Sequence, residues 1–189
     1  MSNDRTFSPR GLDVAAFAQA GAELAGEWPA AALTRLADSG APESPAAAWP
    51  PVRWRVLGSV KPVLGGDAEV WLALSVQAQV HQTCQRCLQP AALDVVVERS
   101  FRFVRDEAQA AELDADSDDD VLVMSRRFDL QDWVEDELLL ALPIVPFHDV
   151  CPAPLPMVSE PEESDEPAKP NPFAVLQALK GDKGSSGSA

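Results

Sequence analysis

Cysteine and histidine side chains gather in two short stretches of the chain. Cys84 and Cys87 are separated by two residues, and His148 and Cys151 repeat that spacing later in the sequence. A cysteine pair at this spacing can present two thiolates to one metal ion, and a His–Cys pair can supply the other two ligands of a tetrahedral shell. The sequence therefore predicts a zinc site made of these four residues, provided that the fold brings the two stretches together.

Other interpretations of these residues stay open. Cys84 and Cys87 can be ordinary turn cysteines, with Cys151 at the start of a flexible tail. His81 is a reserve ligand, although its place in a polar run is more typical of an exposed residue on a strand. The chain has three cysteines and lacks the apolar core of a signal peptide near its start, so reduced thiols or metal ligation fit better than a disulfide framework.

Catalytic use of these residues finds little support in the sequence. A CxxC pair that exchanges disulfides needs a helix N-terminus behind its first cysteine, and here Pro90 and a strand-like run from Leu93 follow instead. Neither a phosphate-binding glycine-rich loop nor a nucleophile elbow is found. We therefore expect a protein that is not an enzyme, with no catalytic residues and no small-molecule substrate.

Composition limits the class of partner. The chain has 189 residues and a formal net charge of -15, which suits one domain with tails. The negative field repels nucleic acids and anionic membranes and attracts basic proteins. No uninterrupted apolar run approaches the length of a membrane span. These features predict a cytoplasmic protein that does not contact a membrane.

The chain divides into four parts by pattern. Residues 1–39 are predicted to be a helical segment, with two helices over residues 11–38, and residues 40–51 a surface connector rich in proline and alanine. Residues 52–151 are predicted to form an α+β core, and residues 152–189 an acidic linker, a short docking helix and a tail. The first predicted helix has a shared face made of Phe17, Ala20, Gly21 and Leu24.

The elements that must position the cysteines show alternating hydrophobicity. Three runs within residues 52–104 repeat with a period of two, which predicts an antiparallel meander with one wet face. The CxxC pair falls in the connection between the second and third runs. Residues 121–124 can add a short strand, and Asp129 is a helix N-cap before an amphipathic helix that Pro143 ends. The face of this helix that we expect to be exposed has Asp132, Glu135 and Asp136.

Charge is unevenly distributed along this core. Residues 50–105 are the only basic region, whereas residues 106–120 contain acids and no basic residue. We expect the acidic segment to be a solvated, poorly ordered loop, with a landing site for a basic partner as the alternative. The candidate RNA contacts are the arginines of the predicted sheet: Arg53, Arg55, Arg86, Arg99 and Arg102. The candidate partner contacts of the docking helix are Phe173, Leu176 and Leu179.

Three blocks of sequence carry a resemblance to a known family. They are CQRCL from Cys84, VEDELLLALPIVPFH from Val134 with Cys151 shortly after, and KPNPFAVLQALK from Lys169. In this order they resemble the YceD-like family, the large ribosomal RNA subunit accumulation proteins. The resemblance covers mainly residues 70–180. It implies a non-enzymatic factor for the synthesis, processing or stability of large-subunit (23S) ribosomal RNA, and it supplies no catalytic residue.

The resemblance leaves the mechanism open between two routes. In the first, the sheet arginines form a local basic face that contacts ribosomal RNA directly. In the second, which we prefer because of the net charge, the acidic segments hold a basic ribosomal or RNA-processing protein and the RNA benefits indirectly. An alternative of another class is a small zinc-stabilised redox or RNA-processing-associated enzyme.

Overall fold

The computed structural model describes residues 6–116 and 120–152. The predicted docking helix with Phe173, Leu176 and Leu179, and the linker and tail over residues 153–189, lie outside these residues. None of the helices within the described ranges is long and apolar enough to cross a membrane.

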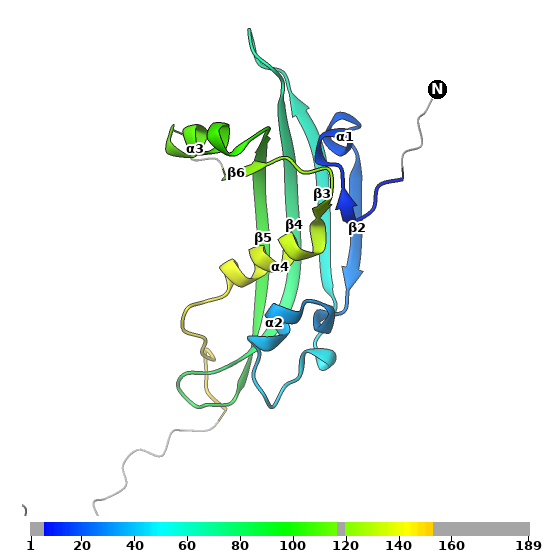
Figure 1. The fold of residues 1–189 in the computed structure, drawn as a ribbon. Coiled ribbons are helices and arrows are strands. Elements are labelled where there is room, and N and C mark those ends of the chain that lie inside the picture. Colours follow the sequence, from blue (N-terminus) through cyan, green and yellow to red (C-terminus); the bar gives the residue numbers. More distant parts are fainter. Residues whose placement is uncertain (1–5, 117–119, 153–189) are drawn as a thin grey trace, which may run out of the picture. The chain divides into compact units, whose positions relative to one another are not determined.

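A five-stranded sheet forms the centre of the fold (Figure 1). Its strand order is β2-β3-β4-β5-β6, and all neighbours are antiparallel except β5 and β6, which run parallel. The predicted meander is confirmed. The strands are β2 (Glu23–Trp28), β3 (Val52–Lys61), β4 (Glu69–Thr83), β5 (Pro90–Val104) and β6 (Asp120–Val123). A separate two-stranded ladder joins β1 (Arg10–Leu12) to β7 (Phe128–Asp129).

Strand alternation divides the sheet into a covered face and an open face. Val56 pairs with Leu74 in the register of β3 and β4, and both side chains are buried in one apolar cluster. The helices α1 (Val14–Gln19), α2 (Thr34–Asp38) and α4 (Leu130–Ala141) contribute Phe17, Leu36 and Leu138 to the same cluster. The core therefore lies between the sheet and these helices, and the opposite face stays wet, as the alternation predicted.

The N-terminal segment is not purely helical, which corrects the prediction for residues 11–38. Helix α1 is short, and Gly21 follows it with a positive φ of 56°. That backbone conformation ends the helix and suits glycine. Leu24 then lies in β2, which pairs along its length with β3. The helical pattern was misleading because strand pairing with β3 outweighs the helix propensity of an alanine-rich stretch.

Residues 40–51 lie at the surface, where their four prolines are exposed as predicted, but the segment is packed against the domain instead of being a loose connector. Ala41, Ala46 and Trp49 are buried, and the 3-10 turn Ala46–Ala48 lies within this segment. The Trp49 indole N–H donates to the Ser44 carbonyl at 2.9 Å, and the Ala41 N–H donates to the His81 carbonyl at 2.7 Å. The first hydrogen bond closes the segment on itself, and the second anchors it to the end of β4.

The acidic stretch after β5 contains a helix, α3 (Glu107–Asp116), in place of the irregular loop that we expected. The Asp106 carboxylate accepts the N–H of Gln109 at 2.9 Å, which is the geometry of a helix cap. Alanine and glutamate have high helix propensity, so a run of acids does not prevent a helix here. Glu107 and Glu112 are exposed, in agreement with the prediction that this segment is solvated.

Helix α4 begins and ends as predicted. The Asp129 side chain accepts the N–H groups of Gln131 and Asp132, and Leu142 is already extended before Pro143. One part of the prediction is wrong, because Glu135 is buried instead of lying on the exposed face. Glu137 is buried as well and forms an ion pair with Arg99 at 2.8 Å. The helix thus buries two carboxylates, while their arginine partners Arg35 and Arg99 remain 49% and 39% exposed.

Glu135 connects α4 to α2. One carboxylate oxygen lies 3.0 Å from the Arg35 guanidinium, and the other accepts the N–H of Leu36 at 3.0 Å. Leu36 is in the first turn of α2, whose N-cap residue Leu33 has no side-chain oxygen to offer. A carboxylate from another helix therefore satisfies an amide that would otherwise lack a partner.

Replacement of this carboxylate should destabilise the fold. We expect Glu135→Ala to lower the free energy of unfolding by about 2 kcal/mol, because it removes a hydrogen bond between a charged group and a buried amide. Glu27→Ala is the matched control, since Glu27 pairs with Arg53 at 3.1 Å on the exposed surface. It should cost less than about 1 kcal/mol. Urea unfolding of both variants checks this, and equal losses would contradict the capping role of Glu135.

Candidate metal centre

The first two ligands lie in a tight turn at the end of the β4–β5 hairpin. The Cys84 N–H donates to the Gln89 carbonyl at 2.9 Å, and the Leu88 N–H donates to the Cys84 carbonyl at 2.9 Å. Leu88 has a positive φ of 59°, which lets the chain reverse within a few residues. The turn joins two 15-residue strands, so it holds Cys84 and Cys87 at the end of a rigid ladder.

The other two ligands come from the segment that follows α4. The Gln85 N–H donates to the Pro146 carbonyl at 2.8 Å, and this hydrogen bond places the segment beside the turn (Figure 1). His148 and Cys151 then face the cysteines of the turn. The condition for a shared site, that the fold brings the two stretches together, is thus met.

The four predicted ligand residues form one cluster. The ligand atoms of Cys84, Cys87, His148 and Cys151 all lie within 4.8 Å of one another. Cys87 Sγ is 3.4 Å from His148 Nδ1. A tetrahedral zinc ion with bonds of about 2.3 Å to sulfur and about 2.0 Å to nitrogen needs ligand separations of this size. The geometry can therefore hold a metal ion.

His81 is not part of this cluster. Its Nδ1 is 2.7 Å from the Ser44 hydroxyl, and its ring stacks on Trp49 with a centroid separation of 5.8 Å. The side chain is also half-buried, so the expectation of an ordinary exposed residue is wrong. Packing against residues 40–51, which the sequence did not reveal, explains its position.

A backbone carbonyl sets the orientation of His148. The imidazole Nε2 lies 3.0 Å from the Pro90 carbonyl, which can only accept a hydrogen bond. The ring proton therefore belongs on Nε2, and Nδ1, which faces Cys87, keeps its lone pair free for a metal. Such a hydrogen bond behind a histidine ligand is a common support of metal sites.

The surroundings of Cys84 and Cys151 shift the pKa values of their thiols in opposite directions. Burial tends to raise the pKa of Cys84, but hydrogen bonds from the backbone N–H groups of Cys87, Arg86 and His148 outweigh it and lower the pKa to about 5. Burial and the neighbouring Cys87 and Cys84 raise the pKa of Cys151. The pKa values of Cys84 and Cys151 are thus shifted in opposite directions, and a divalent ion would act as a counter-charge to the thiolates.

Arg86 lies beside the cluster in a way that sequence reasoning did not assign. Its guanidinium is 3.9 Å from Cys151 Sγ and 5.7 Å from the Phe147 ring centroid. A divalent ion held by three thiolates and one neutral histidine would carry a net charge of about -1 with its ligands. The Arg86 guanidinium would offset that charge. The position of Arg86 between Cys84 and Cys87 in the sequence was the feature that could have indicated its closeness to the cluster.

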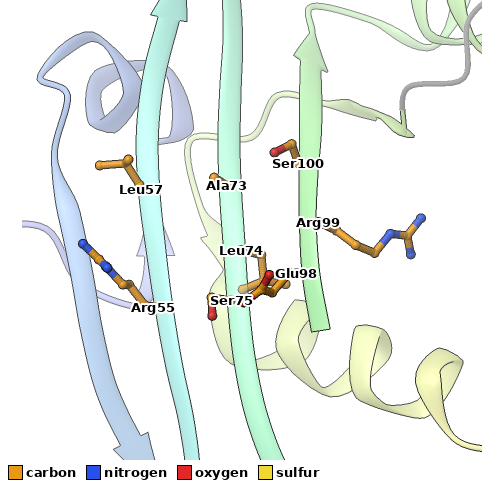
Figure 2. A pocket seen from close by; sticks show the side chains of 8 residues that line it. All are labelled: Arg55, Leu57, Ala73, Leu74, Ser75, Glu98, Arg99 and Ser100. Atoms are coloured by element: carbon orange, nitrogen blue, oxygen red, sulfur yellow. The ribbon is translucent and has the colours of Figure 1, made fainter. Parts of the chain in front are cut away.

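The five arginines do not form one basic face. Arg53, Arg55 and Arg102 lie on the open face, where each pairs with a carboxylate, at 3.1 Å to Glu27, 2.8 Å to Glu23 and 2.9 Å to Glu69. Arg99 has the register of the covered face and pairs with Glu137 and Asp120. In Figure 2 the guanidinium groups of Arg55 and Arg99 point away from one another. Arg86 is in the turn.

The open face of the sheet has a shallow groove whose lining includes small, uncharged side chains. This groove of about 400 Å³ crosses β3, β4 and β5, and Figure 2 shows the side chains that line it. Arg55 and Glu98 lie at its edges, and Ala73 and Ser75 form its floor. Small and uncharged side chains on the floor provide neither a nucleophile–base pair nor a cationic surface for phosphates.

Loss of the imidazole should abolish metal binding. We expect the full chain to bind one Zn²⁺ and His148→Gln to lose it, with a lower thermal unfolding midpoint in the presence of Zn²⁺, because three protein ligands hold the two segments together less tightly than four. His81→Gln is the control with the same chemical change outside the cluster. Metal content by mass spectrometry and thermal unfolding with and without chelator measure the effect. A chain that purifies without metal and melts identically with chelator would contradict the site.

Removal of the nearby cation should weaken the same site without destroying it. We expect Arg86→Gln to raise the dissociation constant for Zn²⁺ by about 10-fold, in the range found for residues that support metal ligands. Arg127→Gln removes the same charge from an exposed position between β6 and β7 and should leave the constant unchanged. Competition with a chromogenic chelator gives both constants, and equal values for the two variants would show that Arg86 has no such role.

Comparison with known proteins places this geometry in context. The family model described as large ribosomal RNA subunit accumulation protein YceD matches residues 72–180, which is more than half of the chain and includes the whole cluster. A protein of Haemophilus influenzae named large ribosomal RNA subunit accumulation protein YceD is 36% identical over 110 residues. That alignment covers 56% of this chain and 62% of the relative, less than two thirds of its length. No solved structure matches the chain.

Proposed function

This chain belongs to the YceD family, and we propose that it acts as a non-enzymatic factor in ribosome biogenesis that supports the accumulation of large-subunit ribosomal RNA. The observation that carries the proposal is the family match over residues 72–180. This match spans the β4–β5 hairpin, helix α4 and the cluster that joins them. The part of the chain that has relatives is thus the part that builds the candidate metal centre.

Zinc is the metal proposed for the cluster, in a structural role. Three cysteines and one histidine are typical ligands of structural zinc, and four protein ligands fill a tetrahedral shell. A catalytic zinc needs an open position for water or substrate, which this ligand set does not provide. The ion would connect the turn at Cys84 to the segment at His148, so its contribution would be to the fold of this end of the domain.

A basic ribosomal or RNA-processing protein is the proposed direct partner, with the RNA supported indirectly. The electrostatics favour this route over direct RNA binding, because Arg53, Arg55, Arg99 and Arg102 are held in ion pairs with carboxylates. Binding to phosphates would have to break these pairs. The formal charge of -15 and the exposed acids of α3 act in the same direction.

A redox enzyme is a weaker second candidate that one observation favours. The pKa of Cys84, about 5, is that of a reactive thiolate, although burial opposes the shift. However, the Cys84 side chain is buried, and the CxxC pair lies in a turn between strands. A disulfide substrate could not reach a sulfur in that position. Turnover of a dithiol or disulfide substrate by the pure chain, lost in Cys84→Ser, would favour this candidate instead.

A strain that lacks the gene tests the proposed function. We expect a fall in the ratio of large-subunit to small-subunit ribosomal RNA, and we expect the wild-type chain to restore it. The tagged chain should retain a basic protein at low salt and release it at about 1 M salt, where the Debye length is only about 3 Å. An unchanged RNA ratio would contradict the function, and recovery of free large-subunit RNA with no protein would contradict the proposed route.

A further inference from the structure

Large apolar side chains are exposed around the candidate metal centre. Ile144 is 99% exposed and Val150 is 84% exposed, and three neighbours are at least half exposed. We call this group the apolar rim, and its members are Leu88, Ile144, Val145, Phe147 and Val150. Single exposed apolar residues are common on protein surfaces, but a group of this size around one site indicates an interaction surface.

The metal cluster positions the rim. Leu88 directly follows the ligand Cys87, Phe147 directly precedes the ligand His148, and Val150 directly precedes Cys151. The ligand atoms lie within 4.8 Å of one another, so these three neighbours must gather around the same point. The rim is therefore a surface that the ligands hold in place instead of a loose apolar tail.

Leu88 supplies an independent argument that the rim is used. Its φ of 59° is a conformation that glycine adopts freely and that a leucine adopts only with strain. The side chain is 67% exposed, so the free chain gains little burial in return. Glycine at this position would stabilise the isolated turn. A strained residue with an exposed apolar side chain is explained if that side chain is buried in a complex.

The chemistry of the rim selects a protein over other occupants. Aliphatic side chains such as Ile144 and Val150 offer RNA neither hydrogen bonds nor stacking. Among the described residues, Arg86 is the cation found in contact with the rim, through Phe147, and one guanidinium is a small basic surface for phosphates. A second copy of the chain would bring another formal charge of -15 to the contact. Asp149 is exposed and lies between Phe147 and Val150 in the sequence, and its negative charge favours a cation opposite it.

We infer that the apolar rim is a docking surface for a cationic protein segment that presents apolar side chains, with Asp149 as an ionic contact. This inference rests on the proposed function and adds the place and chemistry of partner binding. It also gives the metal a second consequence, because an ion that joins the two segments would pre-organise the surface before the partner arrives. Pre-organisation of this kind lowers the entropy cost of binding.

Site-specific photo-cross-linking in cells tests the surface. The probe is p-benzoylphenylalanine at position 144 of the full chain, compared with the same probe at position 64. Leu64 is fully exposed at the tip of the β3–β4 hairpin, so it is a matched apolar position away from the rim. We expect position 144 to cross-link a protein with a basic isoelectric point and position 64 to give no such product. Three kinds of result would overturn the inference. They are a cross-link from position 144 to RNA alone or to a second copy of the chain, equal cross-linking from positions 144 and 64, and the absence of any cross-link.

Two double variants make the test specific. Phe147→Ser with Val150→Ser should reduce the cross-link from position 144 several-fold, whereas Val63→Ser with Leu64→Ser should leave it unchanged. Zinc content and the thermal midpoint are measured for both double variants beside the cross-link, because Phe147 lies 5.7 Å from Arg86 at the candidate metal centre. Asp149→Lys should also reduce the product. An unchanged cross-link in the rim variants would overturn the docking surface.

The failure of the docking surface and that of the proposed function can be distinguished. In the strain that lacks the gene, we expect the rim double variant to restore less large-subunit RNA than the wild type does. If the variant restores the RNA fully, the docking surface is wrong and the proposed function stands. If the wild type itself leaves the RNA ratio unchanged, the proposed function is wrong, and the cross-linking results still decide whether the rim binds a cationic protein.

Discussion

The contact between the β4–β5 turn and the segment after α4 is the constraint on which the functional end of this protein depends. Cys87 and His148 are 61 positions apart in sequence, and their ligand atoms are 3.4 Å apart. Three thiols within 4.8 Å of one another repel one another once they ionise, unless a cation lies among them. Two long strands and a capped helix bring the groups together, and a metal ion would turn that proximity into a stable connection.

Electrostatics inside the domain follow the same logic of paired opposite charges. The chain is strongly acidic, yet its helix α4 buries Glu135 and Glu137, which the fold tolerates because Arg35 and Arg99 lie against them. Each pair joins α4 to another element, α2 in one case and β5 in the other. The arginines are thus used to hold the domain together, and this leaves the outer surface dominated by acids.

The surface therefore combines two features that suit one kind of partner. An acidic exterior attracts cationic proteins at long range, and a fixed group of apolar side chains can bury surface at short range. The residues of the apolar rim are separate from those that line the groove on the open face, which include Ala73 and Ser75. A factor that binds and holds other macromolecules is a physically consistent description of such a molecule.

Local sequence patterns determined the meander, the limits of α4 and the four residues of the candidate metal centre. Alternation, the Asp129 cap, Pro143 and the spacing of cysteine and histidine all act within a few residues, so they can be read without the fold. Tertiary structure decided the features that need a distant neighbour. Leu24 lies in a strand because β3 is available to pair, and Glu135 is buried because Arg35 and the Leu36 amide need a carboxylate. Hydrogen bonds and ion pairs between distant segments override local propensity, since an unpaired buried polar group costs more than a propensity difference.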